Sequence, residues 1–439
     1  MKAESSPDRI NIKHEMHASP SSFPFENLPW GINGVEKYEQ HSKNNPEKVE
    51  AVKQIFETVF ELEVKRLAMF ESEMKRGVSF PLTSINLREL AEAIYTKQGR
   101  TVGNLSGEPK KKQVEFLFGS ILGTTDASPF DFFEEPFSQM VKRLPNALKD
   151  LEVDREPEDF TVYTLSSPIH ELGTMSPEFL AQMKKDPYRT LGDLYAESVE
   201  RLVLADTKEN QPLSVNFTGI SMGASLSGRA AENLLVRGLV TQEKEEKNKP
   251  QLSLTAYEPA GRNESPLGIL QVPLGFIAET GYQLATNPDL KKIEDGRAKF
   301  AKNLREVMAA RGVHAHMDDE QAQYKKEIVG PGGRDFPMGK LVRDLVTGVP
   351  MGENVKSNEI VGRRDPTLYS PLRHLQALAK DRQPASLGSS ITSRTHKNRR
   401  VFGGVKMSHS IPSYRESVLR RMDRAAEEML RLRKTRKPS

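Results

Sequence analysis

The chain has 439 residues, of which 36% are hydrophobic and 28% charged, so it is long enough for a sizeable core with an added region. Its 64 basic and 60 acidic residues leave a net charge of +4, a near-balance that gives no general case for nucleic-acid binding. The absence of cysteine excludes disulfides, a thiol nucleophile and cysteine-ligated zinc.

The two ends of the chain and its hydropathy predict a soluble cytoplasmic protein. The start, MKAESSPDRINIKHEMHASPSS, lacks the apolar segment of a secretory signal. No stretch approaches the ~20 apolar residues that span a bilayer, so we expect no membrane span. Two Lys/Arg-rich runs, KNRR at 397–400 and RLRKTRKPS at the end, are interpreted as solvated.

The first third of the sequence divides at about residue 45. Residues 1–45 are polar, with Pro, Ser and Asn scattered through them, and predict an extended arm. Residues 46–150 predict a helical N-terminal extension with possible first strands. Apolar residues at helical spacing indicate one helix from Pro46 to Gly77 and a second from Asn86 to Gln98.

The segment that follows is less regular. The apolar run Val114 to Leu122 fits either a strand or a buried helix, and periodicity does not decide between them. Residues 130–151 have a helical pattern that we expect Pro145 to break. Asp159 to Leu165 is a clearer strand, and Thr190 to Thr207 reads as an amphipathic helix.

A strand, a tight turn and a helix follow from Leu213. The strand is Leu213 to Phe217, the turn is Gly219-Ile220-Ser221-Met222-Gly223, and a helix begins at Ala224. In a G-x-S-x-G turn the glycines are needed because a Cβ would collide with the strand or helix. The helix N-terminus directs partial positive charge toward the Ser oxygen.

On these residues the sequence resembles the α/β-hydrolase family, whose nucleophile elbow has this motif. The resemblance implies a mostly parallel sheet flanked by helices, with Ser221 as the nucleophile. It also implies an oxyanion hole with one N–H from Met222 and one from the loop after a neighbouring strand. Asp159 to Leu165 is taken as that strand, and Ser167 as the donor because Pro168 has no N–H.

Downstream of the elbow, strand and helix signals alternate and then give way to helices. Gln251 to Tyr257 predicts a strand, which favours a mainly parallel sheet. Residues 262–350 are predominantly helical, at 267–284, 289–311 and 339–347, and the resemblance implies a cap or lid there. Its apolar residues either line an apolar portion of the substrate or form the core of the cap. The segment HAHMDDE at 314–320 is interpreted as a loop and not as a metal site.

The resemblance implies that an acid and then a base follow the nucleophile in the chain. A poor strand at Val355 to Val361 leads to Asp365, the predicted acid, with Asp335 as the alternative. A last strand at Arg399 to Met407 leads to His409, the predicted base, before a long helix from Ser413 to Leu432.

The sequence thus predicts a hydrolase core at 151–261 and 351–439, with the cap inserted at 262–350. The expected activity is cleavage of a small-molecule carboxylic ester or thioester through an acyl-enzyme, without a cofactor or metal. Two alternatives stay open. One is a non-catalytic interaction protein that retains the fold, and the other is amide, peptide or carbon–carbon hydrolysis on the same fold.

Overall fold

The computed structural model describes residues 35, 38–43, 45–107, 111–118, 134–170, 172–204, 213–220, 222–243, 245–246, 248–257, 319–329, 355–362, 393–396, 399–405 and 416–435. In these residues no helix combines the length and the apolar character needed to cross a membrane.

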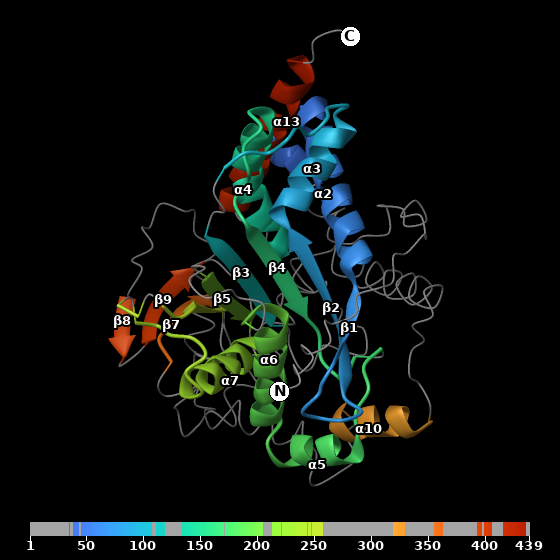
Figure 1. The fold of residues 1–439 in the computed structure, drawn as a ribbon, viewed down its shortest axis with the longest axis vertical. Helices are drawn as coiled ribbons and strands as arrows, with labels where there is room; N and C mark the ends of the chain where they lie inside the picture. The colour runs from blue at the N-terminus through green and yellow to red at the C-terminus, as the bar shows by residue number, and fades with distance from the viewer. Residues whose placement is uncertain are drawn as a thin grey trace, which may run out of the picture.

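The described strands form one nine-stranded sheet with the order β1-β2-β4-β3-β5-β6-β7-β9-β8 (Figure 1). They are β1 (Ala68–Glu71), β2 (Ser79–Asn86), β3 (Lys112–Phe118), β4 (Phe160–Leu165), β5 (Leu213–Ile220), β6 (Gln251–Tyr257), β7 (Ser357–Gly362), β8 (Ser393–His396) and β9 (Arg399–Val405). β2 is antiparallel to both of its neighbours and β8 is antiparallel to β9, whereas all other pairs are parallel. The mostly parallel sheet predicted from the sequence is therefore confirmed.

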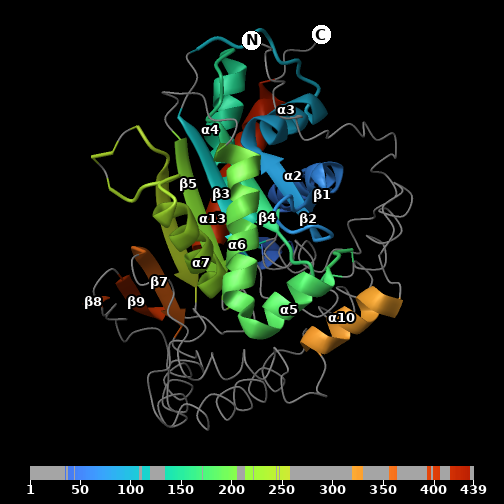
Figure 2. The ribbon, with the colours of Figure 1, turned by 60° about the horizontal axis from the view of Figure 1, so that its bottom comes forward.

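Helices cover both faces of this sheet. They are α2 (Pro46–Arg66), α3 (Leu87–Lys97), α4 (Glu134–Glu152), α5 (Pro177–Lys185), α6 (Pro187–Val199), α7 (Met222–Val236), α10 (Asp319–Val329) and α13 (Glu416–Lys434), with a π-helical segment η4 (Glu200–Leu204) after α6. One core cluster joins α2, α3, α4 and α13 to β2, β3 and β4. A second cluster joins α5, α6 and α7 to the opposite face, where Figure 2 shows α6 and α7 in front of β3 and β5.

Alternation along the central strands determines which side chains enter each core. On β3, Val114, Phe116 and Phe118 point into the cluster under α6 and α7, and Leu117 points into the other. Phe116 also packs edge-on against Phe217 of β5, with ring centroids 5.9 Å apart. Burying each such ring contributes about 1.5–3 kcal/mol, so the two strands are held by packing as well as by their hydrogen bonds.

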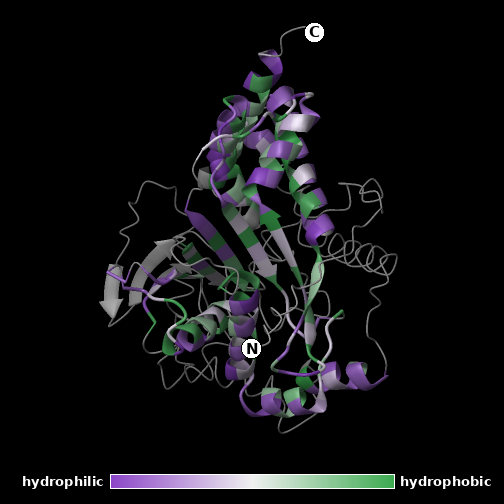
Figure 3. Cartoon of the chain, in the orientation of Figure 1, coloured by the Kyte–Doolittle hydropathy of each residue, from purple (hydrophilic) through white to green (hydrophobic). Residues whose placement is uncertain are grey.

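The helical bundle on the first face is amphipathic. In Figure 3 hydrophobic and hydrophilic residues alternate along α2 and α13, as a helix with one buried side requires. Asn86 caps α3 because its side chain accepts hydrogen bonds from the Arg88 and Glu89 amides. The second predicted helix, Asn86 to Gln98, is therefore confirmed as α3.

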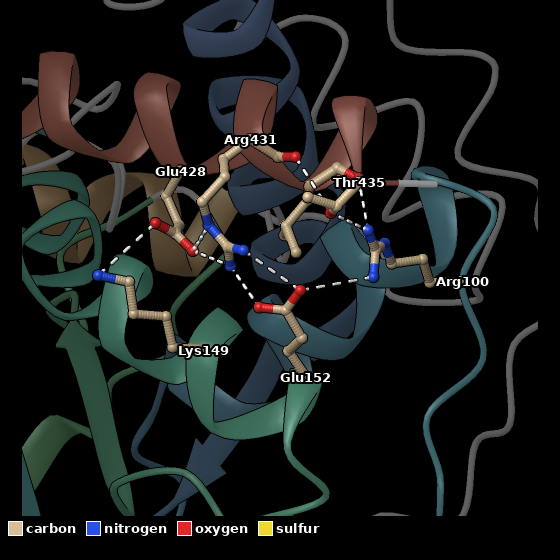
Figure 4. Close-up of polar contacts among 7 residues, drawn as sticks. Arg100, Lys149, Glu152, Glu428, Arg431 and Thr435 are labelled. Atoms are coloured by element: carbon tan, nitrogen blue, oxygen red, sulfur yellow. Dashed lines mark hydrogen bonds and ion pairs between the residues drawn. The ribbon is translucent and has the colours of Figure 1, made fainter. Parts of the chain in front are cut away.

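An ion-pair network connects the C-terminal helix α13 to α4 (Figure 4). The guanidinium of Arg431 donates to Glu152 of α4 and to Glu428 of its own helix, at 2.6 Å for the latter. Arg100 lies 3.8 Å from Glu152 on the other side. The hydrogen bond from Arg431 lowers the pKa of Glu152, so this network holds the C-terminal end of α13 against that of α4 while the carboxylate is ionised.

Two expectations for the first third of the chain are wrong. The helix from Pro46 ends at Arg66 instead of Gly77, because the next residues form β1 and its turn into β2. α4 continues through Pro145 instead of breaking there. Leu144, Ala147 and Leu148 on both sides of this proline are buried, so tertiary packing outweighs the lost hydrogen bond.

The other segments expected in the first third of the chain belong to the sheet. The ambiguous run at Val114 is the central strand β3, and the possible first strands are present as β1, β2 and β3. The three predicted helices of the cap at 262–350 lie outside the described residues. From that region the structure describes α10, which begins at Asp319 in the segment interpreted as a loop.

Candidate active site

The strand β5 and the helix α7 meet at Ser221. β5 ends at Ile220 and α7 begins at Met222, so the turn between them is one residue long; Ser221 itself lies outside the described residues. A Cβ at Gly219 would lie 2.5 Å from the Gly223 carbonyl oxygen and 2.6 Å from the Ala224 nitrogen. Only glycine fits this approach of strand to helix, as the sequence predicts for a nucleophile elbow.

The helix α7, which follows this junction, is closely packed against the sheet and against α6. Ala224 and Leu226 are fully buried in the cluster beneath β5. Gly192 of α6 allows close approach to α7, since a Cβ there would lie 2.5 Å from the Arg229 Cβ. α7 has 15 residues, and the amides of its first turn, beginning at Met222, lack partners within the helix.

The carboxyl ends of the central strands lie level with one another. Phe118 is in register with both Leu165 of β4 and Gly219 of β5, and Ile220 is in register with Tyr257 of β6. In an open parallel sheet ligands bind outside this edge. The junction of β5 and α7 therefore lies among the carboxyl ends of the central strands, where sheets of this kind bind ligands.

Ser167 lies on the same edge but not beside the elbow. It follows β4, and β3 lies between β4 and β5. Its carbonyl accepts from the His170 amide at 3.0 Å, and its hydroxyl accepts from the Ile169 amide at 3.3 Å, which makes a local turn. The strand directly beside β5 is β3, whose last residue, Phe118, is in register with Gly219.

His170 in this loop is a buried structural histidine. Its Nδ1 accepts from the Leu172 amide at 3.2 Å, and 4% of the residue is exposed. Burial, with a contribution from Lys325 of α10, lowers the pKa of His170 to about 3. The imidazole is thus neutral at physiological pH, and one of its nitrogens accepts a hydrogen bond within its own loop.

The predicted acid and base lie outside the described residues, as does the alternative acid Asp335. The strands that precede them are described. β7 ends at Gly362, three residues before Asp365, and β9 ends at Val405, four residues before His409. β6, β7 and β9 are parallel neighbours, so both strands run toward the edge that carries the elbow. Asp365 and His409 stay predictions.

A buried carboxylate next to the elbow strand was missed from the sequence. Glu115 in the middle of β3 is 4% exposed, and its Oε1 accepts from the Thr218 hydroxyl of β5 at 2.8 Å. The available signal was one acidic residue inside the apolar run VEFLF. In the described part of the chain, no group of three His, Cys, Asp or Glu side chains is arranged to hold a metal ion.

No protein-family model and no curated protein sequence matches the chain. Similar solved structures include a peroxisomal α/β-hydrolase from Saccharomyces cerevisiae, with 11% identity over 83% of this chain and 88% of its own, at a TM-score of 0.34. A probable hydrolytic enzyme from Pseudomonas aeruginosa has 13% identity over 78% of this chain and 88% of its own, at 0.33. The thioesterase domain from the curacin biosynthetic pathway has 13% identity over 83% of this chain and 98% of its own, at 0.30. Similarity at these identities and TM-scores gives no information about the chemistry of this chain.

The fold class rests on the chain itself. The sheet is mostly parallel, helices cover both faces, and a one-residue turn links a central strand to a helix. This is the α/β class, with a mostly parallel sheet flanked by helices, that the sequence predicts.

Proposed function

We propose that the chain is a serine hydrolase that cleaves a carboxylic ester or thioester through an acyl-enzyme on Ser221. The observation that carries this proposal is the turn between β5 and α7, with one residue between strand and helix and with Gly219 in contact with the Gly223 and Ala224 backbone. A turn of this tightness holds the apex side chain at the top of the sheet, where a substrate can reach it.

The electrostatic support for the reaction comes from α7. The Met222 amide, at the N-terminus of the helix, is the proposed donor to the oxyanion of the tetrahedral intermediate. Such a donor stabilises the transition state by about 3 kcal/mol, and the helix dipole adds to it.

The proton transfers are assigned to His409 and Asp365. His409 takes the Ser221 proton as the Oγ attacks the carbonyl carbon, and returns it to the leaving alcohol or thiol as that bond breaks. Water then attacks the acyl-enzyme, with His409 again as the base, and releases the acid. Asp365 orients the imidazole, with Asp335 as the alternative. The direction of β7 and β9 supports this assignment.

The second oxyanion donor is proposed from the loop after β3. The register places the end of β3 beside Gly219, whereas Ser167 follows a strand that is one further away. In hydrolases of this architecture the corresponding donor follows the strand next to the elbow strand. Ser167 is retained as the competing donor. An apolar portion of the substrate and a cytoplasmic location also stay proposals.

Turnover of p-nitrophenyl acyl esters tests the proposal. The wild type should release a burst of nitrophenol equal to the number of active sites, followed by slower steady turnover. Ser221→Ala should lose the burst. Ser253→Ala is the matched control, because Ser253 is an exposed serine on the neighbouring strand β6. A burst that survives in Ser221→Ala would refute the proposal, and no turnover in the wild type would favour a non-catalytic interaction protein on this fold.

A further inference from the structure

Among the described strands β1 is the last at one side of the sheet, and two of its residues point their backbone groups away from β2. The Ser72 amide donates to the Val78 carbonyl at 2.9 Å, so Ser72 faces β2. Because successive residues of a strand alternate, Phe70 and Ala68 also face β2. The amides and carbonyls of Met69 and Glu71 therefore point away from the sheet.

Such an edge is a template on which a further strand can pair. Glu71 is exposed, and Met69 is partly exposed. Pairing about a two-fold axis would bring β1 of a second copy alongside and extend the nine-stranded sheet through the interface.

The Glu71 carbonyl, which a second β1 strand would need as a hydrogen-bond acceptor, already accepts a hydrogen bond from the side chain of Arg201. Arg201 donates from Nη1 to the Glu71 carbonyl at 2.6 Å, and its Nη2 lies 2.9 Å from the Glu73 carboxylate. Its guanidinium carbon is 5.0 Å from the centre of the Phe70 ring, which places the charged group over the strand.

The residues around Arg201 hold its side chain beside β1. Arg201 lies in η4, a π-helical segment, and such segments are rare and often occur at functional positions. Glu197, four residues earlier and 2% exposed, accepts from the Ser72 hydroxyl at 2.6 Å and the Glu73 amide at 2.7 Å. These bonds hold the β1–β2 turn against α6, so that Arg201 meets the edge in one fixed position.

We propose that Arg201 is an edge-blocking residue that prevents the sheet from extending through β1 into a second copy of this chain. The proposal is independent of the hydrolase assignment. It concerns a surface on the opposite side of β2 and β4 from the elbow strand.

Light scattering coupled to size-exclusion chromatography tests it on the full chain. Arg201→Ala should have a higher mass than the wild type at the same concentration, rising further as concentration rises. Arg237→Ala is the matched control, because Arg237 pairs with Glu200 in the same π-helical segment at 2.7 Å and does not contact β1. This control should keep the wild-type mass.

A second variant separates edge pairing from general unfolding. Met69→Pro removes the outward amide of β1, and proline is tolerated on an edge strand where its nitrogen faces solvent. Adding it to Arg201→Ala should return the mass to that of the wild type. The proposal is overturned if Arg201→Ala keeps the wild-type mass at every concentration, or if it associates and Met69→Pro does not reverse the association.

Discussion

Replacing Gly219 by alanine tests whether the turn at Ser221 is a working elbow. The new Cβ would meet the Gly223 oxygen at 2.5 Å and the Ala224 Cα and nitrogen at 2.6 Å. All three are backbone atoms at the start of α7, so a side-chain rotation does not relieve the contact. Strand and helix must separate by about 1 Å for the 2.5 Å contact to reach the ordinary van der Waals distance of 3.4 Å, at an expected loss of about 1–3 kcal/mol in the free energy of unfolding.

The functional effect should exceed the structural one. The separation moves Ser221 and the Met222 amide relative to each other and to the proposed base. A displacement of about 1 Å at a reacting group lowers the rate by about 10²-fold. We therefore expect Gly219→Ala to react with a fluorophosphonate probe about 10²-fold more slowly, under conditions where urea titration shows it folded.

A matched glycine distinguishes damage at the turn from general destabilisation. A Cβ at Gly192 would also meet a neighbour at 2.5 Å, the Arg229 Cβ, but two turns into α7. Gly192→Ala should lose similar stability and retain most of the labelling rate. Wild-type labelling in Gly219→Ala, or an equal loss of labelling in Gly192→Ala, would refute the reasoning.

Three further changes have defined outcomes. Glu63 is 1% exposed, and burial raises its pKa well above the usual value. The free energy of unfolding of the wild type should therefore fall as pH rises from about 4.5 through the folded-state pKa of Glu63. Glu63→Gln should raise the urea midpoint at about pH 8 and lose this advantage near pH 4. Glu197→Ala removes a buried acceptor of the Ser72 hydroxyl and Glu73 amide, and should lower the free energy of unfolding by about 3 kcal/mol in urea titration. His170→Asn keeps an acceptor for the Leu172 amide and should leave the pH profile of probe labelling unchanged, whereas a shifted profile would show that His170 takes part.

The close approach of β5 to α7 could be predicted because its requirements are local. One strand, two glycines and one helix lie consecutively in the chain, and the contact between Gly219 and Ala224 spans five residues. The N-terminal strands could not, because β1 is a four-residue strand whose partner is β2, and β2 in turn depends on a distant partner. β2 contains Pro81, which argues against a strand in isolation, yet it pairs with β4 some eighty residues later.

The oxyanion loop shows a second limit. The strand Asp159 to Leu165 was identified from its residues, but strand order is not encoded in any single strand. The chain inserts β3 between β4 and β5, and β3 was the run that periodicity left ambiguous. Ser221 is proposed as the nucleophile from the spacing of the motif, whereas the choice between Ser167 and the loop after Phe118 depends on which strands are neighbours.

The central claim is that Ser221 is the nucleophile, and peptide mass spectrometry after fluorophosphonate treatment tests it most directly. One adduct is expected, on the peptide that contains Ser221, and it should be lost in Ser221→Ala and kept in Ser253→Ala. An adduct on any other residue, or the same adduct yield in Ser221→Ala, would contradict it.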